Sequence, residues 1–180
     1  MPVAGKIEVV DGGRLIAVSF EDVLDYHGPG SPGGAALAYK VLERALPLLD
    51  PDGPCERREV LVETAFGGPG ARDAFELVLR AVSGDRFHLD PSLARPERGR
   101  ALERFVFRLA YRDGETTLTL REDFVTDEFI DLARAAQRTA DEERRLGALK
   151  LALAERVMER PATDVYDEAE SPAERGSVGL

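Results

Sequence analysis

A loop rich in glycine and proline, residues 28–34, runs directly into an apolar helical pattern, and this junction constrains the fold more than any other stretch. Its four glycines let the backbone approach a ligand closely, while its two prolines restrict the loop. Ser31 is a suitable N-cap and Pro32 suits the first helical position, so free amides of the first turn would face a group near His27. Such amides favour an anion or a metal-bound group. We therefore expect the rest of the chain to hold this loop at the edge of a pocket.

Short β-rich runs and amphipathic segments follow one another along the chain, which predicts an α+β fold. Strands are expected at residues 6–10, 14–20, 59–64, 86–89, 102–111 and 115–121. Helices are expected at residues 20–26, 32–49, 72–82 and from 127 onwards. Asp-Gly turns join two of the strand pairs. We predict a mixed, mainly antiparallel sheet with helices packed on it, plus a long C-terminal helix.

The C-terminal third combines a long helical pattern with an acidic tail. Thr126 is a good N-cap with acidic residues in the first turn, and the helix is expected to continue to about residue 145. The apolar stripe loses phase over 141–145 and resumes at Leu146, so either the helix kinks near Gly147 or its last turns face a different partner. We expect a domain at 1–121, a helical extension at 122–160 and a disordered acidic tail at 161–180.

Composition excludes several functional classes. The 180 residues suffice for one sizeable core, and a net charge of −10 argues against neutralising nucleic-acid phosphates. No apolar run approaches the ~20 residues of a membrane span, so we expect neither a membrane nor a nucleic acid as partner. The single cysteine, Cys55, excludes an intrachain disulfide framework and a zinc ribbon, and we expect a cytoplasmic location. Only three of the 24 basic residues are lysines, as in proteins of GC-rich bacterial genomes.

A second glycine-rich loop, residues 65–70, follows the apolar strand at 59–64 and precedes the next helix. In an α/β layer two such loops commonly form the rim of a pocket. Glu63 ends the strand and is the best-placed carboxylate for a general base or a ligand, although a loop-capping role fits it equally well. We assign no catalytic residue. We predict one binding pocket lined by His27, Gly28, Gly30, Ser31, Gly33, Glu63, Gly67 and Gly68.

Three further side chains have two interpretations each. His27 either contacts a ligand directly or hydrogen-bonds a neighbouring turn. Arg104 and Arg108 share one face of an expected strand, and they either bind an anion together or lie in solvent. Within the pocket hypothesis, the substitution Gly33→Val should abolish ligand binding and leave the fold intact.

Residues 26–33, Tyr-His-Gly-Pro-Gly-Ser-Pro-Gly, followed by a helix with Ala38-Tyr39, resemble the signature of the FmdE family of formylmethanofuran dehydrogenase components. That signature reads aromatic, His, Gly, His, any residue, Cys, Pro, Gly. Glu63 at a strand end and Asp73-Ala74 in the next helix resemble the family's second element, and the similarity spans roughly residues 20–121. The resemblance implies an FmdE-like α/β domain that pairs as a homodimer. It also implies a metal site at this loop, commonly zinc, with His27 as a ligand.

The chain departs from that signature at the metal ligands. Pro29 and Ser31 stand where the family has its second histidine and its cysteine, and no cysteine lies between Glu63 and Asp73. Zinc takes about four ligands, and only His27 matches. We therefore expect the scaffold without a cofactor, with zinc at His27 as the alternative.

Two functional hypotheses remain. In the first, the domain binds a small molecule or an anion at the two glycine-rich loops, and whether it also catalyses a reaction stays open. In the second, it is a noncatalytic dimerising or partner-binding module that uses the C-terminal helix. The retained glycines favour the first hypothesis, and the missing metal ligands favour the second. We prefer the first because binding phosphate or carboxylate at a helix N-terminus requires backbone amides and no metal.

Overall fold

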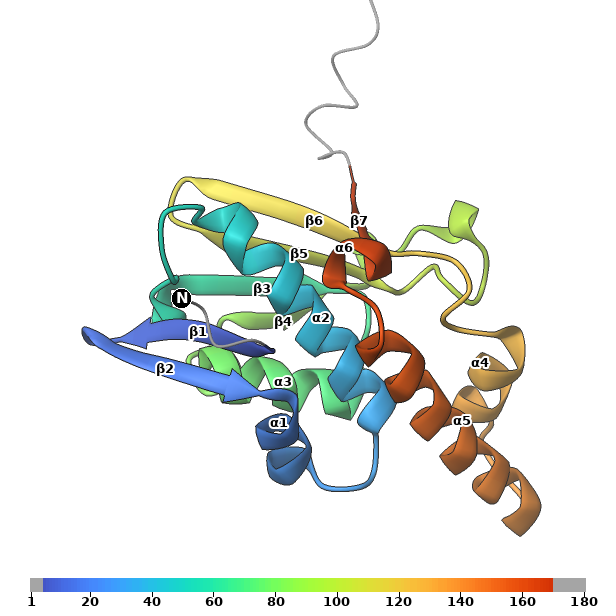
Figure 1. Cartoon of the computed structure of the whole chain (residues 1–180). Helices are drawn as coiled ribbons and strands as arrows, with labels where there is room; N and C mark the ends of the chain where they lie inside the picture. The colour runs from blue at the N-terminus through green and yellow to red at the C-terminus, as the bar shows by residue number, and fades with distance from the viewer. Residues whose placement is uncertain (1–4, 170–180) are drawn as a thin grey trace, which may run out of the picture.

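The computed structural model describes residues 5–169, and its main sheet has the strand order β4-β3-β5-β6-β7 (Figure 1). These strands are β3 (Val60–Thr64), β4 (Phe87–Leu89), β5 (Val106–Tyr111), β6 (Gly114–Leu120) and β7 (Tyr166–Glu168). β3 pairs in parallel with β4, and the other neighbouring strands of this sheet pair antiparallel. The predicted mixed, mainly antiparallel sheet is confirmed, and the fold is α+β.

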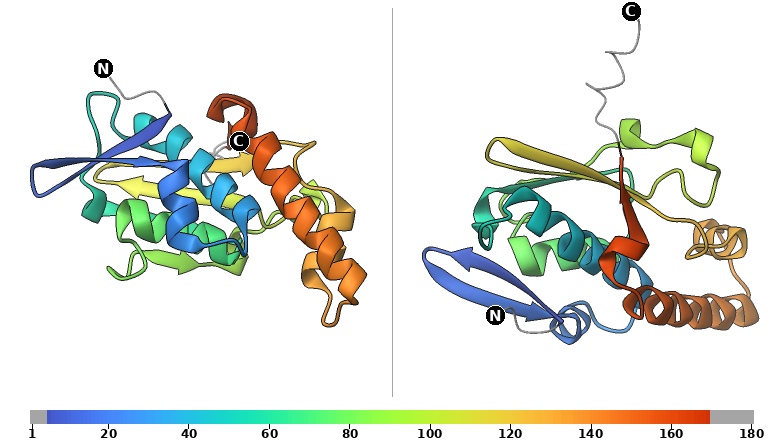
Figure 2. Two further views of the ribbon diagram at one scale, coloured as in Figure 1. Left: turned by 60° about the horizontal axis from the view of Figure 1, so that its bottom comes forward. Right: turned by 45° about the horizontal axis from the view of Figure 1, so that its top comes forward.

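Helices α2 (Pro32–Leu49) and α3 (Pro69–Leu79) lie on one face of this sheet (Figure 2). Burial alternates along β3, where Val62 and Thr64 are fully buried whereas Glu63 is partly exposed. α2 also contacts α3, the short helix α1 (Phe20–His27) and the C-terminal helices. It is therefore buried on several sides and occupies the centre of the molecule.

The N-terminal hairpin forms a separate two-stranded sheet, as its Asp-Gly-Gly turn predicts. β1 (Lys6–Asp11) and β2 (Arg14–Ser19) pair antiparallel over their whole length. Gly12 and Gly13 take φ values of +60° and +84°, a left-handed conformation that glycine adopts without strain.

The starts of α2 and α3 touch each other through glycine. A Cβ atom on Gly70 would lie 2.3 Å from the carbonyl oxygen of Ser31 and 2.8 Å from the amide nitrogen of Ala35. On the facing helix, a Cβ on Gly34 would lie 3.4 Å from the amide nitrogen of Ala71. Because both close contacts involve backbone atoms, a larger residue at position 70 would push the two helices apart. The two glycine-rich loops are thus held side by side.

Two helices occupy the region where one long C-terminal helix was predicted. α4 (Asp127–Arg134) begins at the predicted cap, since the Thr126 side chain accepts a hydrogen bond from the Phe129 amide. α5 (Ala140–Met158) begins at a capping box formed by Thr139 and Glu142. Of the two alternatives for this region, the kink near Gly147 has no support, because α5 runs through that residue and the two helices are separated at 135–139. None of the helices in residues 5–169 is long and apolar enough to cross a membrane.

The predicted disordered tail begins with ordered structure. α6 (Ala162–Val165) leads into β7, whose Tyr166 is fully buried and donates a hydrogen bond from its hydroxyl to the Leu37 carbonyl. The prediction of disorder is therefore wrong for residues 162–168, because the burial of Tyr166 orders this segment in spite of its acidic residues. Residues 170–180 of the predicted tail lie outside the described part of the chain.

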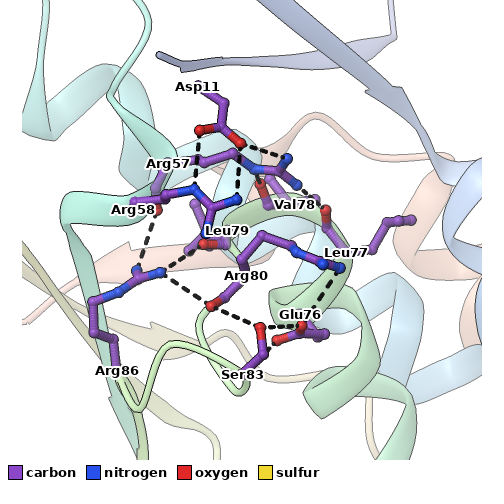
Figure 3. Close-up of polar contacts among 10 residues, drawn as sticks. All are labelled: Asp11, Arg57, Arg58, Glu76, Leu77, Val78, Leu79, Arg80, Ser83 and Arg86. Atoms are coloured by element: carbon purple, nitrogen blue, oxygen red, sulfur yellow. Dashed lines mark hydrogen bonds and ion pairs between the residues drawn. The ribbon is translucent and has the colours of Figure 1, made fainter.

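Arginine side chains close the C-terminal end of α3 (Figure 3). Arg57 donates to the carbonyls of Leu77 and Val78, at 2.5 and 2.9 Å, and Arg86 donates to those of Leu79 and Arg80, at 2.9 and 3.0 Å. The last carbonyls of a helix have no partner within the helix. Burial lowers the pKa of both Arg57 and Arg86, yet their contacts keep the positive charge at the negative end of the helix dipole.

Candidate functional site

A cavity of about 400 Å³ opens between the starts of α2 and α3, the segment before β5, and helices α4 and α5. Its volume lies within the range of small-molecule sites, which is roughly 300 to 1,000 Å³. Ser31 and Gly34 contribute the wall from α2, and Gly67, Gly68 and Pro69 contribute the wall from the loop before α3. The two predicted glycine-rich loops therefore do share one cavity.

The starts of α2 and α3 lack the side-chain caps found elsewhere in the chain. Neither Ser31 nor Gly68 provides a side-chain hydrogen bond to its helix, and neither first turn contains an acidic residue. In contrast, α1, α4 and α5 each have a side-chain cap and at least two acidic residues in the first turn. Uncapped amides and the helix dipole make such a start locally positive.

Four basic side chains line the same cavity: Arg104, Arg134, Arg138 and Lys150. No acidic residue of the described chain lines it. Arg104 is exposed, and its side chain forms no hydrogen bond or ion pair with residues 5–169. Arg134 has its Nη1 only 3.7 Å from Glu103 Oε1. Burial lowers the pKa of Arg134, and the nearby charge of Arg104 lowers it further. These two guanidinium groups repel each other, and an anion between them would relieve the repulsion.

The other two cations are already held in place. Arg138 donates from Nη1 to the carbonyls of Leu132 and Ala135, at 2.9 and 3.2 Å, and from Nε to Glu143, at 2.8 Å. It therefore closes the end of α4, and its charge is paired. Lys150 donates to the Gly30 carbonyl at 3.1 Å, which ties α5 to the first glycine-rich loop. Among the described residues, no carboxylate pairs with Lys150, so its charge is uncompensated.

The remaining wall of the cavity is apolar. Phe66 and Phe105 pack with ring centroids 4.5 Å apart, and Phe129, Ile130 and Leu146 complete the surface. A Cβ on Gly68 would lie 2.4 Å from Cζ of Phe66, so the glycine lets this ring lie against the loop backbone. The cavity thus combines a cationic side with an aromatic side.

Only three of the eight predicted pocket residues line this cavity: Ser31, Gly67 and Gly68. Gly33 faces α5, because its Cβ would lie 2.9 Å from Cδ2 of Leu153. Gly28 has a φ of +85° and ends α1, and its amide bonds the Leu24 carbonyl at 2.7 Å. A Cβ on Gly33 would also lie 3.2 Å from the Lys150 carbonyl oxygen, so the structure does not support the expectation that Gly33→Val leaves the fold intact.

His27 forms a hydrogen bond within the protein, although its partner lies on α3 and not in a neighbouring turn. Its Nδ1 lies 2.7 Å from Oδ2 of Asp73 on α3, and its side chain is 8% exposed. Its Nε2 is buried and has no partner among the described residues. Because this ring does not line the cavity, the predicted direct contact with a ligand has no support there. The pair instead fixes the first glycine-rich loop to α3.

Glu63 lies on the sheet face opposite α2 and α3, and the prediction that it shares the pocket is wrong. Its Oε2 is 3.4 Å from Nη1 of Arg108, which also donates to Glu115 at 2.9 Å. The alternation of β3 explains this, because Val62 and Thr64 take the inward positions. The expected pair of arginines also separates, since Arg108 is paired on the open face and Arg104 lines the cavity.

Neither a metal site nor a reactive thiol is evident in residues 5–169. No group of three or more His, Cys, Asp or Glu side chains there could hold a metal ion, so the residues around His27 do not fit the zinc that the resemblance implies. Cys55 is buried and forms no disulfide, and burial raises the pKa of its thiol to about 11. The thiol is therefore protonated at neutral pH.

The sequence reasoning missed the contribution of the C-terminal helices to this site. Arg134, Arg138 and Lys150 lie a hundred or more residues after the first glycine-rich loop. The one signal near them in the sequence is the loss of phase over 141–145, which lies between Arg138 and Lys150. No family model matches the chain and no curated protein matches it, so the resemblance to the FmdE family stays a prediction.

Proposed function

We propose that this protein binds a small anionic molecule in the cavity between α2, α3, α4 and α5. One observation carries the proposal: two uncapped helix starts and four basic side chains meet at one cavity that no described acidic residue lines. Binding an anion would neutralise Arg104 and Lys150, which have no carboxylate partner, and would satisfy amides of the first helical turns. The residues do not indicate a reaction, so binding is the function proposed.

Isothermal titration of the full chain with inorganic phosphate, citrate and benzoate tests this proposal. We expect at least one of them to bind at millimolar concentration or below. The variant Arg104→Gln should weaken that binding by about tenfold to a hundredfold, because a hydrogen bond to a charged group contributes roughly 1.5 to 3 kcal/mol. Arg14→Gln is the matched control, since Arg14 is an exposed arginine of β2. The absence of binding by all three anions, or equal binding by both variants, would overturn the proposal.

A second candidate function, homodimerisation through the C-terminal helices, has one observation in its favour. Leu151 on α5 is 59% exposed and borders a groove that includes Leu24, Pro29 and Pro32. An exposed apolar patch of this kind often marks an interface. Sedimentation of the wild type and of Leu151→Glu tests this alternative. A wild-type dimer that the substitution converts to monomer supports it, and a wild-type monomer at every concentration refutes it.

A further inference from the structure

We infer that the ligand of this cavity is a phosphate monoester whose phosphoryl group is attached to an aromatic ring. This inference rests on the proposed function and adds the charge and the shape of the ligand. Two features of the cavity determine them: the number of uncompensated cations and the aromatic wall beside them.

The charge of the head group follows from the pairing of the four cations. Arg138 is neutralised by Glu143, and Arg134 faces Glu103. Arg104 and Lys150 have no carboxylate partner among residues 5–169. Two uncompensated positive charges match a dianion, and a phosphate monoester carries nearly two negative charges at neutral pH.

The hydrogen-bond donors around the cavity also favour phosphate over carboxylate. The guanidinium of Arg104 and the ammonium of Lys150 approach from the segment before β5 and from α5. The starts of α2 and α3, which lie side by side, form a third wall that carries amides without side-chain caps. Donors that converge from several sides fit a tetrahedral group with three free oxygens better than a planar carboxylate with two.

The apolar wall requires a ligand that has an apolar body attached to its anionic head group. Phe66, Phe105 and Phe129 supply three rings, and Ile130 and Leu146 fill the space between α4 and α5. Phe105, Ile130 and Leu146 are buried, whereas Phe66 and Phe129 are partly exposed, and inorganic phosphate would leave these two rings in contact with water. Aromatic rings favour offset or edge-to-face contact with another ring, so an aryl body gains more here than an alkyl chain of equal area.

Isothermal titration of the full chain at pH 7.5 with three probes tests the inference. The probes are 1-naphthyl phosphate, inorganic phosphate and 1-naphthoate. We expect 1-naphthyl phosphate to bind at least about tenfold more tightly than either of the others, because it alone uses both sides of the cavity. If inorganic phosphate binds equally well, the aromatic body is refuted. If 1-naphthoate binds equally well, the dianionic head is refuted. In both cases the anion-binding function stands, whereas binding of none of the three also counts against that function.

Variants separate the two sides of the cavity. Phe129→Ala should weaken 1-naphthyl phosphate by about tenfold and leave inorganic phosphate unchanged. Ala133→Asp places a carboxylate at an exposed position of the lining and should weaken both phosphates. Because Ala133 is exposed, this variant should fold even if Phe129→Ala does not. An unchanged affinity of Ala133→Asp for 1-naphthyl phosphate would place the ligand elsewhere.

Discussion

The two ends of α3 use basic side chains in opposite ways. At the C-terminal end, Arg57 and Arg86 donate to four consecutive carbonyls and complete the helix (Figure 3). At the N-terminal end, the cavity brings basic side chains to the positive end of the helix dipole, where a helix alone favours acidic residues. The first arrangement stabilises the fold by itself. The second is electrostatically unfavourable without an anion, and this contrast supports a binding role for the N-terminal end.

The largest expected effect is the loss of an arginine at the C-terminal end of α3. Arg57→Met should lower the free energy of unfolding by about 3 kcal/mol, because it leaves two carbonyls and Asp11 without their buried donor. Urea denaturation measures this change. The matched control is Arg58→Met, whose side chain is 58% exposed while it bonds the same Asp11. Similar destabilisation by both substitutions would contradict a specific role of Arg57 in closing the helix.

A glycine at the N-terminal end should come next in size. Gly70→Ala should cost about 2 kcal/mol, since its Cβ would overlap the backbone of Ser31 and Ala35. Gly147→Ala is the control within a helix, because a Cβ there meets nothing within 4 Å. That substitution should stabilise the protein by roughly 0.5 to 1 kcal/mol through helix propensity. Thermal unfolding of the two variants should therefore shift in opposite directions, and shifts in the same direction would contradict the close crossing of α2 and α3.

The local elements of the fold and the cavity differ in how far the sequence predicts them. Strands β1 to β6, the first three helices and both glycine-rich loops follow from local patterns, since turn residues and helix caps act over a few residues. The cavity depends on contacts between segments far apart, such as Lys150 with Gly30. Gly33 is a second example, because the sequence alone does not tell whether this glycine packs against a helix or contacts a ligand. Its position against Leu153 shows that it packs against α5. The ordered strand β7 was missed because its order depends on the burial of one residue, Tyr166, in an otherwise polar segment.

The carboxylate of Glu76 gives the C-terminal end of α3 a pH dependence. Burial raises the pKa of Glu76, but hydrogen bonds from Ser83 and from the Val82 amide lower it overall. Because the pKa of Glu76 is lower in the folded state than in the unfolded state, its carboxylate stabilises the fold above about pH 4.5. This stabilisation is lost as the pH falls through the pKa of the folded state. Glu76→Gln should therefore cost roughly 1 to 2 kcal/mol at pH 7 and less at pH 3.

Denaturation of the wild type and of Glu76→Gln across this pH range measures the difference. Glu155→Gln is the control, because Glu155 is an exposed glutamate of α5. We expect its difference from the wild type to stay constant with pH. If the difference for Glu76→Gln were also constant, the carboxylate charge would not contribute to closing the helix.

The smallest change in stability is expected for an arginine of the cavity. Arg104→Gln removes a charge that has no described carboxylate partner and that repels Arg134. Without ligand, the variant should be as stable as the wild type or slightly more stable, which is opposite in sign to the effect of Arg57→Met. With 1-naphthyl phosphate present, the wild type should gain more stability than the variant, because a ligand stabilises the state that it binds more tightly. Thermal unfolding with and without the probe measures both effects. A ligand-free Arg104→Gln variant that is clearly less stable than the wild type would show that Arg104 supports the fold, and the contrast between the two ends of α3 would then fail.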